Sequence, residues 1–457
     1  MRFIFRILLI VSLVFGLTGN DGAISSATLD KSDILTDQEN LELCRIINAS
    51  GIQRIDSLIS AYKQNGRFNG NILVALNGFN VYQTSAGYAD PLNKIPARPE
   101  TIYQLASVSK QFTAAAIMIL KADGKLDFDD LLIRHIPELP YPEVTIRQLL
   151  HHTGGLPNYM YLTDRYWKSD LPPDNEDVVE LMAKYRLPAF FKPGSRYDYS
   201  NTGYMLLATV VQRVSGMSLN AFLQLRIFGP LGMTSTYVFS TADSLVSRRQ
   251  ADGFRATRHG YSRITDTRNN GPVGDKGVCS SVGDMFKWDC ALYTDSPISQ
   301  ELIQEAFTPV ETTGGKEVQY GYGFRIRYAG ETRVIYHNGL WEGARTNFMR
   351  YPDHRNTIIV LNNTSTRINH ELTRQIEAII LGNDEAEVTD LITRKAIEEG
   401  ADQAIETYNE LLENENMAAV NFDVVDSIIS YLDKSGKKEK ALQLKQVSVV
   451  CRELAGI

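Results

Sequence analysis

Residues 104–120 read QLASVSKQFTAAAIMIL, and this stretch is the strongest indication of how the chain folds. From Ser107 to Lys121 the side chains are apolar nearly all round, which predicts a helix buried in a core. Gly124 follows closely enough to end that helix. Ser107 and Lys110 are three residues apart at its start, so a helix places both side chains on one face. The stretch therefore predicts a core helix that opens on a serine with an amine beside it.

Segments rich in β-forming residues lie on both sides of this helix, far apart in the chain. Before it, residues 71–76 and 79–85 flank Asn77-Gly78, which predicts a β-hairpin. After it come four further predicted strands, over residues 323–328, 332–337, 346–351 and 357–361. We expect these later strands to join the sheet that begins near residue 71.

Helical patterns account for much of the remaining chain up to residue 382. An amphipathic helix is predicted over residues 48–64, with Gly66 as its stop, and another over residues 203–214. The rest of the middle third is rich in Pro, Gly and Tyr. A sheet built from both ends of a region, with a helical part inserted between them, is an α+β domain, which we assign to residues 48–382.

The two ends of the chain differ from this domain. Residues 1–27 carry basic residues, a short apolar run and then small and polar residues, as a secretory signal peptide does. The run is too short for the roughly 20 residues of a spanning helix, so we expect a secreted or periplasmic protein without a stable membrane span, and residues 28–47 as a leader. Residues 383–457 predict a helical extension, either tetratricopeptide-like or a plain packed tail, which could bind a protein partner.

The composition excludes several classes of function. The net charge of −7 comes from 54 acidic and 47 basic residues without a long block of one sign, so nothing indicates nucleic-acid binding. A small-molecule or peptide substrate fits better. The four cysteines are too few for a disulfide scaffold, and we favour small buried side chains over a bridge. We expect neither a metal nor a cofactor.

The chemistry follows from what a serine hydroxyl needs. It is a weak nucleophile, so a hydrolase places a base beside it and hydrogen-bond donors near the carbonyl that it attacks. A buried lysine in an apolar pocket has a lowered pKa, and its neutral amine can accept the serine proton. Ser-x-x-Lys occurs three times in the chain, as Ser60/Lys63, Ser107/Lys110 and Ser435/Lys438. Only Ser107 opens a strongly apolar helix.

Two further motifs follow in order. Tyr199-Ser200-Asn201 provides a phenol that can exchange protons and an amide that can hold substrate or lysine. His337-Asn338-Gly339, at the end of a predicted strand, provides a ring donor and a glycine that lets the backbone approach a substrate closely. His152-Thr153-Gly154 has the same His-x-Gly spacing but falls outside this order.

This ordered set of motifs resembles the serine β-lactamase and penicillin-binding protein superfamily, and most of all its class C β-lactamase, D,D-carboxypeptidase and esterase-like branch. The segments 104–110, 145–156, 193–204 and 277–288 also look like blocks of that family. The resemblance covers roughly residues 50 to 380 and implies a β-lactamase/transpeptidase-like fold.

The resemblance also implies a role for each motif residue. Ser107 would be the acylated nucleophile, and Lys110 and Tyr199 the groups that transfer protons. Asn201, His337 and Gly339 would line the substrate site, and the N–H groups of Ser107 and Leu340 would form the oxyanion hole. Many β-lactamases have Lys-Thr-Gly at the third motif. His337 in that place implies a weaker, pH-dependent charge toward the substrate.

These residues predict a serine hydrolase that forms an ester on Ser107 and acts on an ester, an amide or a D-amino-acid peptide. One alternative is a true β-lactamase. An alternative of another class is a penicillin-binding sensor or interaction protein that is acylated without turnover. The rate at which the acyl group leaves Ser107 would distinguish them. Gly-x-Ser-x-Gly is absent from the sequence, which argues against an α/β-hydrolase.

Overall fold

A computed structural model describes residues 48–239, 250–257, 260–264, 267–381, 399–413, 422–434 and 436–455, with isolated residues between 38 and 45 and between 389 and 420. The chain divides into two units, Met1–Leu43 and Cys44–Ile457. The expected signal segment, residues 1–27, and most of the expected leader, residues 28–47, lie outside the described residues. Both therefore stay predictions.

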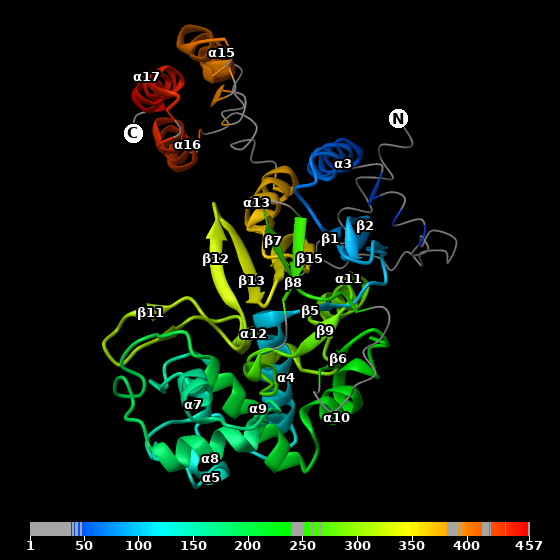
Figure 1. The fold of residues 1–457 in the computed structure, drawn as a ribbon, viewed down its shortest axis with the longest axis vertical. Coiled ribbons are helices and arrows are strands. Elements are labelled where there is room, and N and C mark those ends of the chain that lie inside the picture. The colour runs from blue at the N-terminus through cyan, green and yellow to red at the C-terminus, as the bar shows by residue number, and fades with distance from the viewer. Residues whose placement is uncertain are drawn as a thin grey trace, which may run out of the picture. The chain divides into compact units, whose positions relative to one another are not determined.

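Six antiparallel strands form the central sheet, in the order β12-β13-β14-β15-β1-β2 (Figure 1). The early strands are β1 (Gly70–Leu76) and β2 (Phe79–Ala86), and the later ones are β12 (Arg325–Ala329), β13 (Thr332–Trp341), β14 (Ala344–Tyr351) and β15 (Asn356–Asn362). β1 pairs with β15, with Gly70 opposite Asn362. Strands from both ends of the region thus share one sheet, as the sequence predicts.

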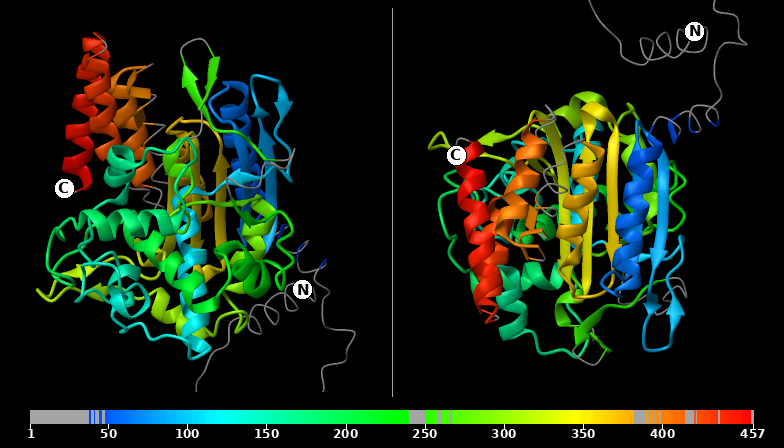
Figure 2. Two further views of the ribbon diagram at one scale, coloured as in Figure 1. Left: turned by 60° about the horizontal axis from the view of Figure 1, so that its bottom comes forward. Right: turned by 90° about the horizontal axis from the view of Figure 1, so that it is seen from above.

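Helices cover the two faces of this sheet. α3 (Ala49–Gln64) and α13 (Ile368–Ile380) pack against each other, and α13 also contacts β14 and β15 (Figure 2). α11 (Val282–Ala291) contacts β1 and β15. Asn347 of β14 hydrogen-bonds to α13, whereas Arg350, three residues later, pairs with Asp289 of α11. Since side chains alternate along a strand, the two helices lie on opposite faces.

The helical part inserted between β2 and β12 contains the predicted core helix. This helix, α4 (Lys110–Ala122), is buried from Lys110 to Leu120, but it begins at Lys110. The prediction that Ser107 opens it is wrong, because Ala106–Ser109 forms a 3-10 turn, η2, before α4. α4 packs against α9 (Asn201–Ser215), the helix that the sequence predicts over residues 203–214.

The remaining elements of the insert are short. The helices are α5 (Leu132–His135), α6 (Ile146–Leu150), α7 (Tyr159–Tyr166), α8 (Asn175–Tyr185), α10 (Leu219–Leu223) and α12 (Gln300–Ala306). A small three-stranded sheet consists of β5 (Tyr103–Gln104), β9 (Val278–Ser280) and β6 (Tyr237–Val238). Three two-stranded sheets are formed by β3 and β4 (Tyr88–Asp90, Ile95–Pro96), β7 and β8 (Phe254–Thr257, Gly260–Arg263), and β10 and β11 (Val310–Glu311, Glu317–Val318).

The C-terminal region is helical and has a core of its own. Its helices are α15 (Ala401–Glu413), α16 (Phe422–Lys434) and α17 (Lys438–Ala455), and both α15 and α16 pack on α17. Tyr408, Phe422 and Leu444 belong to an apolar cluster that shares no member with the core around α4. The tetratricopeptide-like character of this extension stays a prediction.

The expectations for the cysteines and for membrane-spanning helices can be compared with the described residues. Cys44, Cys279, Cys290 and Cys451 are free thiols, and all but Cys290 are buried. Among the described helices, none is by itself long and apolar enough to cross a membrane. The bent pair Asn201–Ser215 and Leu219–Phe228 meets that test by length and composition only.

Candidate active site

Ser107 lies in a strained turn that lifts it out of the core. Ala106, the residue before it, has a φ of 50°, a left-handed conformation that is costly for a residue other than glycine. Between residues 101 and 110, every residue except Gln104 and Ser107 is buried. The η2 turn therefore presents the serine hydroxyl at the surface of an otherwise buried segment.

Lys110 begins the next helix, and its amine points back toward Ser107. The side chain is fully buried. Its Nζ lies 3.2 Å from Ser107 Oγ, 2.9 Å from Asn201 Oδ1 and 2.7 Å from the carbonyl oxygen of Asp275. Burial lowers the pKa of Lys110 to about 7, with the charge of Asp275 opposing this change and that of Arg325 adding to it. A large fraction of the amine is then neutral near pH 7 and able to accept the serine proton.

Tyr199 and Asn201 are held by the cap of α9. The Oγ of Ser200 accepts the N–H of Gly203 at 3.2 Å, which sets the start of the helix. Tyr199 thereby lies just before α9 and Asn201 at its first residue. The ring centroid of Tyr199 is 4.8 Å from Lys110 Nζ. Both side chains therefore reach the amine that contacts Ser107.

The phenol of Tyr199 is protonated at neutral pH. Burial raises its pKa, and a hydrogen bond with Ser107 only partly opposes that change. Lys110 and Tyr199 thus differ in what they can do near pH 7. The amine can accept a proton, and the phenol can donate one.

The third motif lies inside β13 rather than at its end. The pairing of β12 with β13 ends at Tyr336, and among the described strands residues 337–341 pair with β14 alone. The prediction that the motif ends its strand is wrong, because the β14 partner extends β13 to Trp341. η2 packs against both β13 and β14. The third motif therefore lies next to the turn that carries Ser107.

Gly339 marks the closest approach of β13 to this turn. A Cβ atom on Gly339 would lie 2.3 Å from the carbonyl oxygen of Leu105 and 2.2 Å from Thr346 Oγ1, distances that real side chains do not show. Leu340 follows it in the strand, and its side chain is 66% exposed. The structure thus brings the backbone of Leu340 near η2, where the resemblance implies the second donor of an oxyanion hole.

His337 is neutral, so the expected pH-dependent charge toward the substrate is wrong. The ring is fully buried. Its Nδ1 donates to the carbonyl oxygen of Asn338 at 2.8 Å, and its Nε2 accepts from the hydroxyl of Tyr320 at 3.0 Å. Burial, followed by the nearby charges of Lys110 and Arg325, holds the pKa of His337 well below its usual range. His337 therefore orients Tyr320 instead of presenting a cation.

Arg325 adds a permanent cation to the site, and the sequence reasoning missed it. It begins β12 opposite Tyr336, and its guanidinium carbon lies 5.0 Å from the ring centroid of Tyr199. Its Nε is buried without a hydrogen-bond partner among the described residues. The sequence contains no signal for this role, because Arg325 reaches Tyr199 only through the register of β12 with β13.

His152 also lies in the site, although His337-Asn338-Gly339, and not His152-Thr153-Gly154, is the third motif. Its ring centroid lies 4.4 Å from those of Tyr199 and Tyr320. Its Nδ1 accepts the N–H of Ser200 at 3.1 Å, so it helps to position the start of α9. His151 points elsewhere, to the carbonyl oxygen of Tyr320. Among the described residues, no group of three or more His, Cys, Asp or Glu side chains could hold a metal ion.

The other Ser-x-x-Lys matches do not join this arrangement. Ser60 and Lys63 lie on α3, where Lys63 hydrogen-bonds to Thr84 of β2. Ser435 lies outside the described residues, and Lys438 begins α17. Ser107, Lys110, Tyr199, Asn201, His337 and Gly339 come together at one place.

The region that holds this arrangement is similar to known proteins. The profile of a family described as Beta-lactamase matches residues 55–380. Penicillin-binding protein 4* of Bacillus subtilis is 34% identical over 351 residues, covering 72% of this chain and 76% of that protein. D-aminopeptidase of Brucella ovis is 26% identical over 312 residues, covering 68% of this chain and 59% of that protein. The crystal structure of a penicillin binding protein from Bacillus halodurans has a TM-score of 0.62 and 27% identity, covering 71% of this chain and 98% of that chain.

Proposed function

This chain belongs to the Beta-lactamase family as one of its serine hydrolases, and we propose that it cleaves amide bonds in short D-amino-acid substrates through an ester on Ser107. The observation that carries this proposal is the buried Lys110 amine, 3.2 Å from Ser107 Oγ and with a pKa lowered to about 7. A base with that pKa activates a serine at neutral pH without a histidine. The D-aminopeptidase relative supports the choice of an amide with a D-amino acid.

The proposed reaction uses each group in turn. Ser107 Oγ attacks the carbonyl carbon while Lys110 takes the hydroxyl proton, and the N–H groups of Ser107 and Leu340 stabilise the oxyanion. The C–N bond then breaks, and the leaving nitrogen takes a proton from the Tyr199 hydroxyl, which Lys110 restores. Water next attacks the Ser107 ester and gives one proton to the base. That proton returns to Ser107 Oγ when the acid product leaves.

Arg325 supports a leaving group that carries negative charge. The leaving nitrogen must lie near Tyr199, because that phenol protonates it. The guanidinium of Arg325 is next to the ring of Tyr199 and carries a permanent charge. A free carboxylate on the leaving group would be attracted to this cation.

We also propose that the protein is exported, because residues 1–27 have the pattern of a secretory signal peptide. The exported protein would meet peptides with D-amino acids outside the cytoplasm.

The test compares substrates from each candidate function. Purified protein is incubated with D-alanine and L-alanine p-nitroanilides, a chromogenic cephalosporin and a fluorescent penicillin. We expect hydrolysis of the D-anilide, with kcat/KM at least about a thousandfold lower in Ser107→Ala and Lys110→Ala, because nucleophile and base act as a unit. Ser60→Ala, which alters the other Ser-x-x-Lys match in the described residues, is the control and should match the wild type.

Three results would contradict the proposal. Hydrolysis that survives in Ser107→Ala would remove the proposed nucleophile. Faster turnover of the cephalosporin than of any anilide would favour a true β-lactamase. Stable penicillin labelling without turnover of any substrate would favour a sensor that is acylated only.

A further inference from the structure

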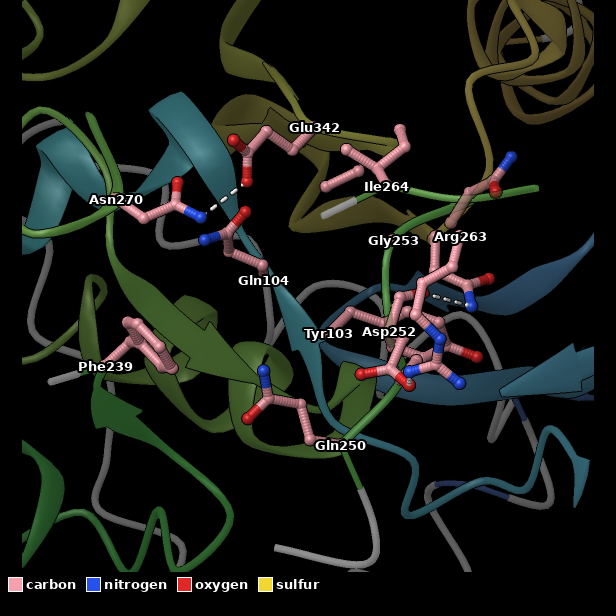
Figure 3. A pocket seen from close by; sticks show the side chains of 14 residues that line it. Tyr103, Gln104, Phe239, Gln250, Asp252, Gly253, Arg263, Ile264, Asn270 and Glu342 are labelled. Carbon is pink, nitrogen blue, oxygen red and sulfur yellow. Dashed lines mark hydrogen bonds and ion pairs between the residues drawn. The ribbon is translucent and has the colours of Figure 1, made fainter. Parts of the chain in front are cut away.

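A polar pocket of about 280 Å³ opens beside the candidate active site (Figure 3). Gln104, Asn270 and Glu342 lie at one end of it in this view, and Asp252 and Arg263 at the other. Gln104 is three residues before Ser107, and Glu342 is two residues after Leu340. The pocket therefore borders both segments that would hold a reacting carbonyl.

The direction of β13 indicates which part of a substrate reaches this pocket. Along β13, Tyr336 is opposite Arg325, Gly339 comes three residues later against η2, and Glu342 follows the end of the strand. Tyr336 and Glu342 are six residues apart, or about 20 Å along an extended strand. With the leaving group at Tyr199 and Arg325, the acyl part bound to Ser107 extends toward Glu342.

The backbone at Glu342 is held in an unusual conformation. Glu342 has a φ of 39°, which is strained for a residue with a side chain. A Cβ on Gly253 would lie 2.1 Å from the carbonyl oxygen of Glu342, and one on Gly343 would lie 2.6 Å from the nitrogen of Phe254. The β13–β14 turn and the segment around Gly253 thus pack backbone against backbone. This contact fixes the backbone position of Glu342.

One oxygen of the Glu342 carboxylate has a hydrogen-bond partner, and the other has none among the described residues. Glu342 Oε2 accepts from the amide of Asn270 at 2.6 Å, and the Oδ1 of Asn270 accepts from the indole N–H of Trp341 at 2.6 Å. Glu342 Oε1 is buried without a hydrogen-bond partner among the described residues. A buried carboxylate oxygen left in that state is costly, so a bound donor would stabilise it.

The cations near the pocket are already engaged. Lys276 interacts electrostatically with Glu342, but its Nζ donates to Tyr159, to the carbonyl oxygen of Pro272 and to Asp275. Arg263 pairs with Asp252 and Asp90. An ammonium nitrogen has three donors, and those of Lys276 have these three partners. Neither cation therefore supplies a hydrogen bond to Glu342 Oε1.

We propose that this pocket binds the acyl part of the substrate and that Glu342 selects a free, protonated amine on it. The inference rests on the proposed function, since it requires an acyl group on Ser107. A hydrogen bond between an ammonium and a carboxylate is among the stronger polar contacts and is stronger than one from a neutral amide. An aminoacyl substrate with a free amine would therefore be preferred over the same substrate with its amine acetylated.

The experiment measures kcat/KM for D-alanine p-nitroanilide and for N-acetyl-D-alanine p-nitroanilide. We expect the full-length wild type to prefer the free amine. Glu342→Gln should lose at least about tenfold on the free-amine substrate and less than about twofold on the acetylated one, because a charge-assisted contact is worth 1.5–3 kcal/mol. Glu331→Gln, an exposed carboxylate between β12 and β13, should change neither value.

A second variant keeps the inference testable if Glu342→Gln fails to fold. Gln104→Glu places another carboxylate on the pocket wall and should increase the preference for the free amine. Equal effects of Glu342→Gln on the two substrates, or no preference shift in Gln104→Glu, would overturn the inference alone. No Ser107-dependent hydrolysis of either substrate would overturn the proposed function, and the inference with it.

Discussion

At the scale of single residues, the site depends on charges that are kept out of water. Lys110 is buried among Ser107, Asn201 and the carbonyl of Asp275, so its amine gains hydrogen bonds but loses solvation. The loss of solvation dominates and lowers the pKa of Lys110 to about 7. Arg325 strengthens this effect as a second cation nearby. Its guanidinium therefore influences the amine that we propose as the base.

The pH dependence of acylation follows from this arrangement. In the proposed mechanism the neutral form of Lys110 accepts the proton, and that form is populated above the pKa of Lys110. For an uncharged substrate such as p-nitrophenyl butyrate, kcat/KM should rise with pH through a midpoint near 7. Arg325→Gln removes a cation that disfavours the ammonium, so the midpoint should move to higher pH.

The matched control for this prediction is Arg325→Lys, which keeps the positive charge and should keep the midpoint close to that of the wild type. A midpoint that is the same in Arg325→Gln and wild type would show that Arg325 does not influence the base. The pH profile separates this electrostatic role from simple loss of substrate binding, which lowers kcat/KM at every pH.

At the scale of elements, the contact between β13 and the η2 turn assembles the site. The turn carries Ser107, and the strand carries His337, Gly339 and Leu340. Thr346 of β14 adds a hydrogen bond from its Oγ1 to the carbonyl oxygen of Leu105 at 2.8 Å. Side chains larger than hydrogen do not fit at Gly339, so the sheet and the turn can meet only through a glycine.

Gly339→Ala should therefore lower both stability and activity. Its methyl group would meet Leu105 and Thr346, which must move apart, and overpacking of this kind costs about 1–3 kcal/mol. We expect the free energy of unfolding in urea to fall by that amount, and kcat/KM to fall at least about tenfold as Ser107 shifts.

Gly283→Ala in α11 is the matched substitution, since the nearest heavy atom to its new methyl group is Ser281 Oγ at 4.0 Å. It should be neutral, or stabilising by up to about 1 kcal/mol, because alanine loses less backbone entropy than glycine on folding. Equal effects of the two substitutions would contradict the proposed packing.

At the scale of the whole molecule, a buried ion pair joins the inserted helices to the sheet. Asp289 of α11 pairs with Arg350 of β14, and the two side chains are only 2% and 1% exposed. Thr357 of β15 donates to the second oxygen of Asp289 at 2.7 Å. One carboxylate thus connects α11 to two strands.

Asp289→Asn should destabilise the protein strongly, since it leaves the charge of Arg350 buried without a counter-ion. Breaking one partner of a buried pair costs about 3–5 kcal/mol, which urea unfolding followed by fluorescence would measure. Arg67→Ala breaks the exposed pair of Arg67 and Glu371 and should cost less than about 1 kcal/mol. A loss of similar size in both variants would argue against the buried pair as a main connection.

Much of the fold and site was predictable because it depends on local patterns. The apolar run after Ser107 predicts the core helix, and Asn77-Gly78 predicts the hairpin of β1 and β2. Ser107 and Lys110 are three residues apart, so local helical geometry is enough to bring their side chains together. The start of α4 was misplaced because η2 depends on the left-handed Ala106, which no periodic pattern reveals.

The sequence by itself predicted Ser107 as the nucleophile and Lys110 as its partner, gave the order of the three motifs, and indicated an α+β domain. The serine–lysine pair follows from residue types at short spacing, whereas the motif order and the α+β domain follow from the sequence of segments along the chain. The tertiary structure alone decided that His337 is a buried neutral ring and that Arg325 lies beside Tyr199. It also decided that one buried oxygen of Glu342, a residue lining the adjacent pocket, has no hydrogen-bond partner among the described residues. The charge state of a side chain depends on how deeply it is buried. Its partners depend on strand register, which brings together residues far apart in the chain.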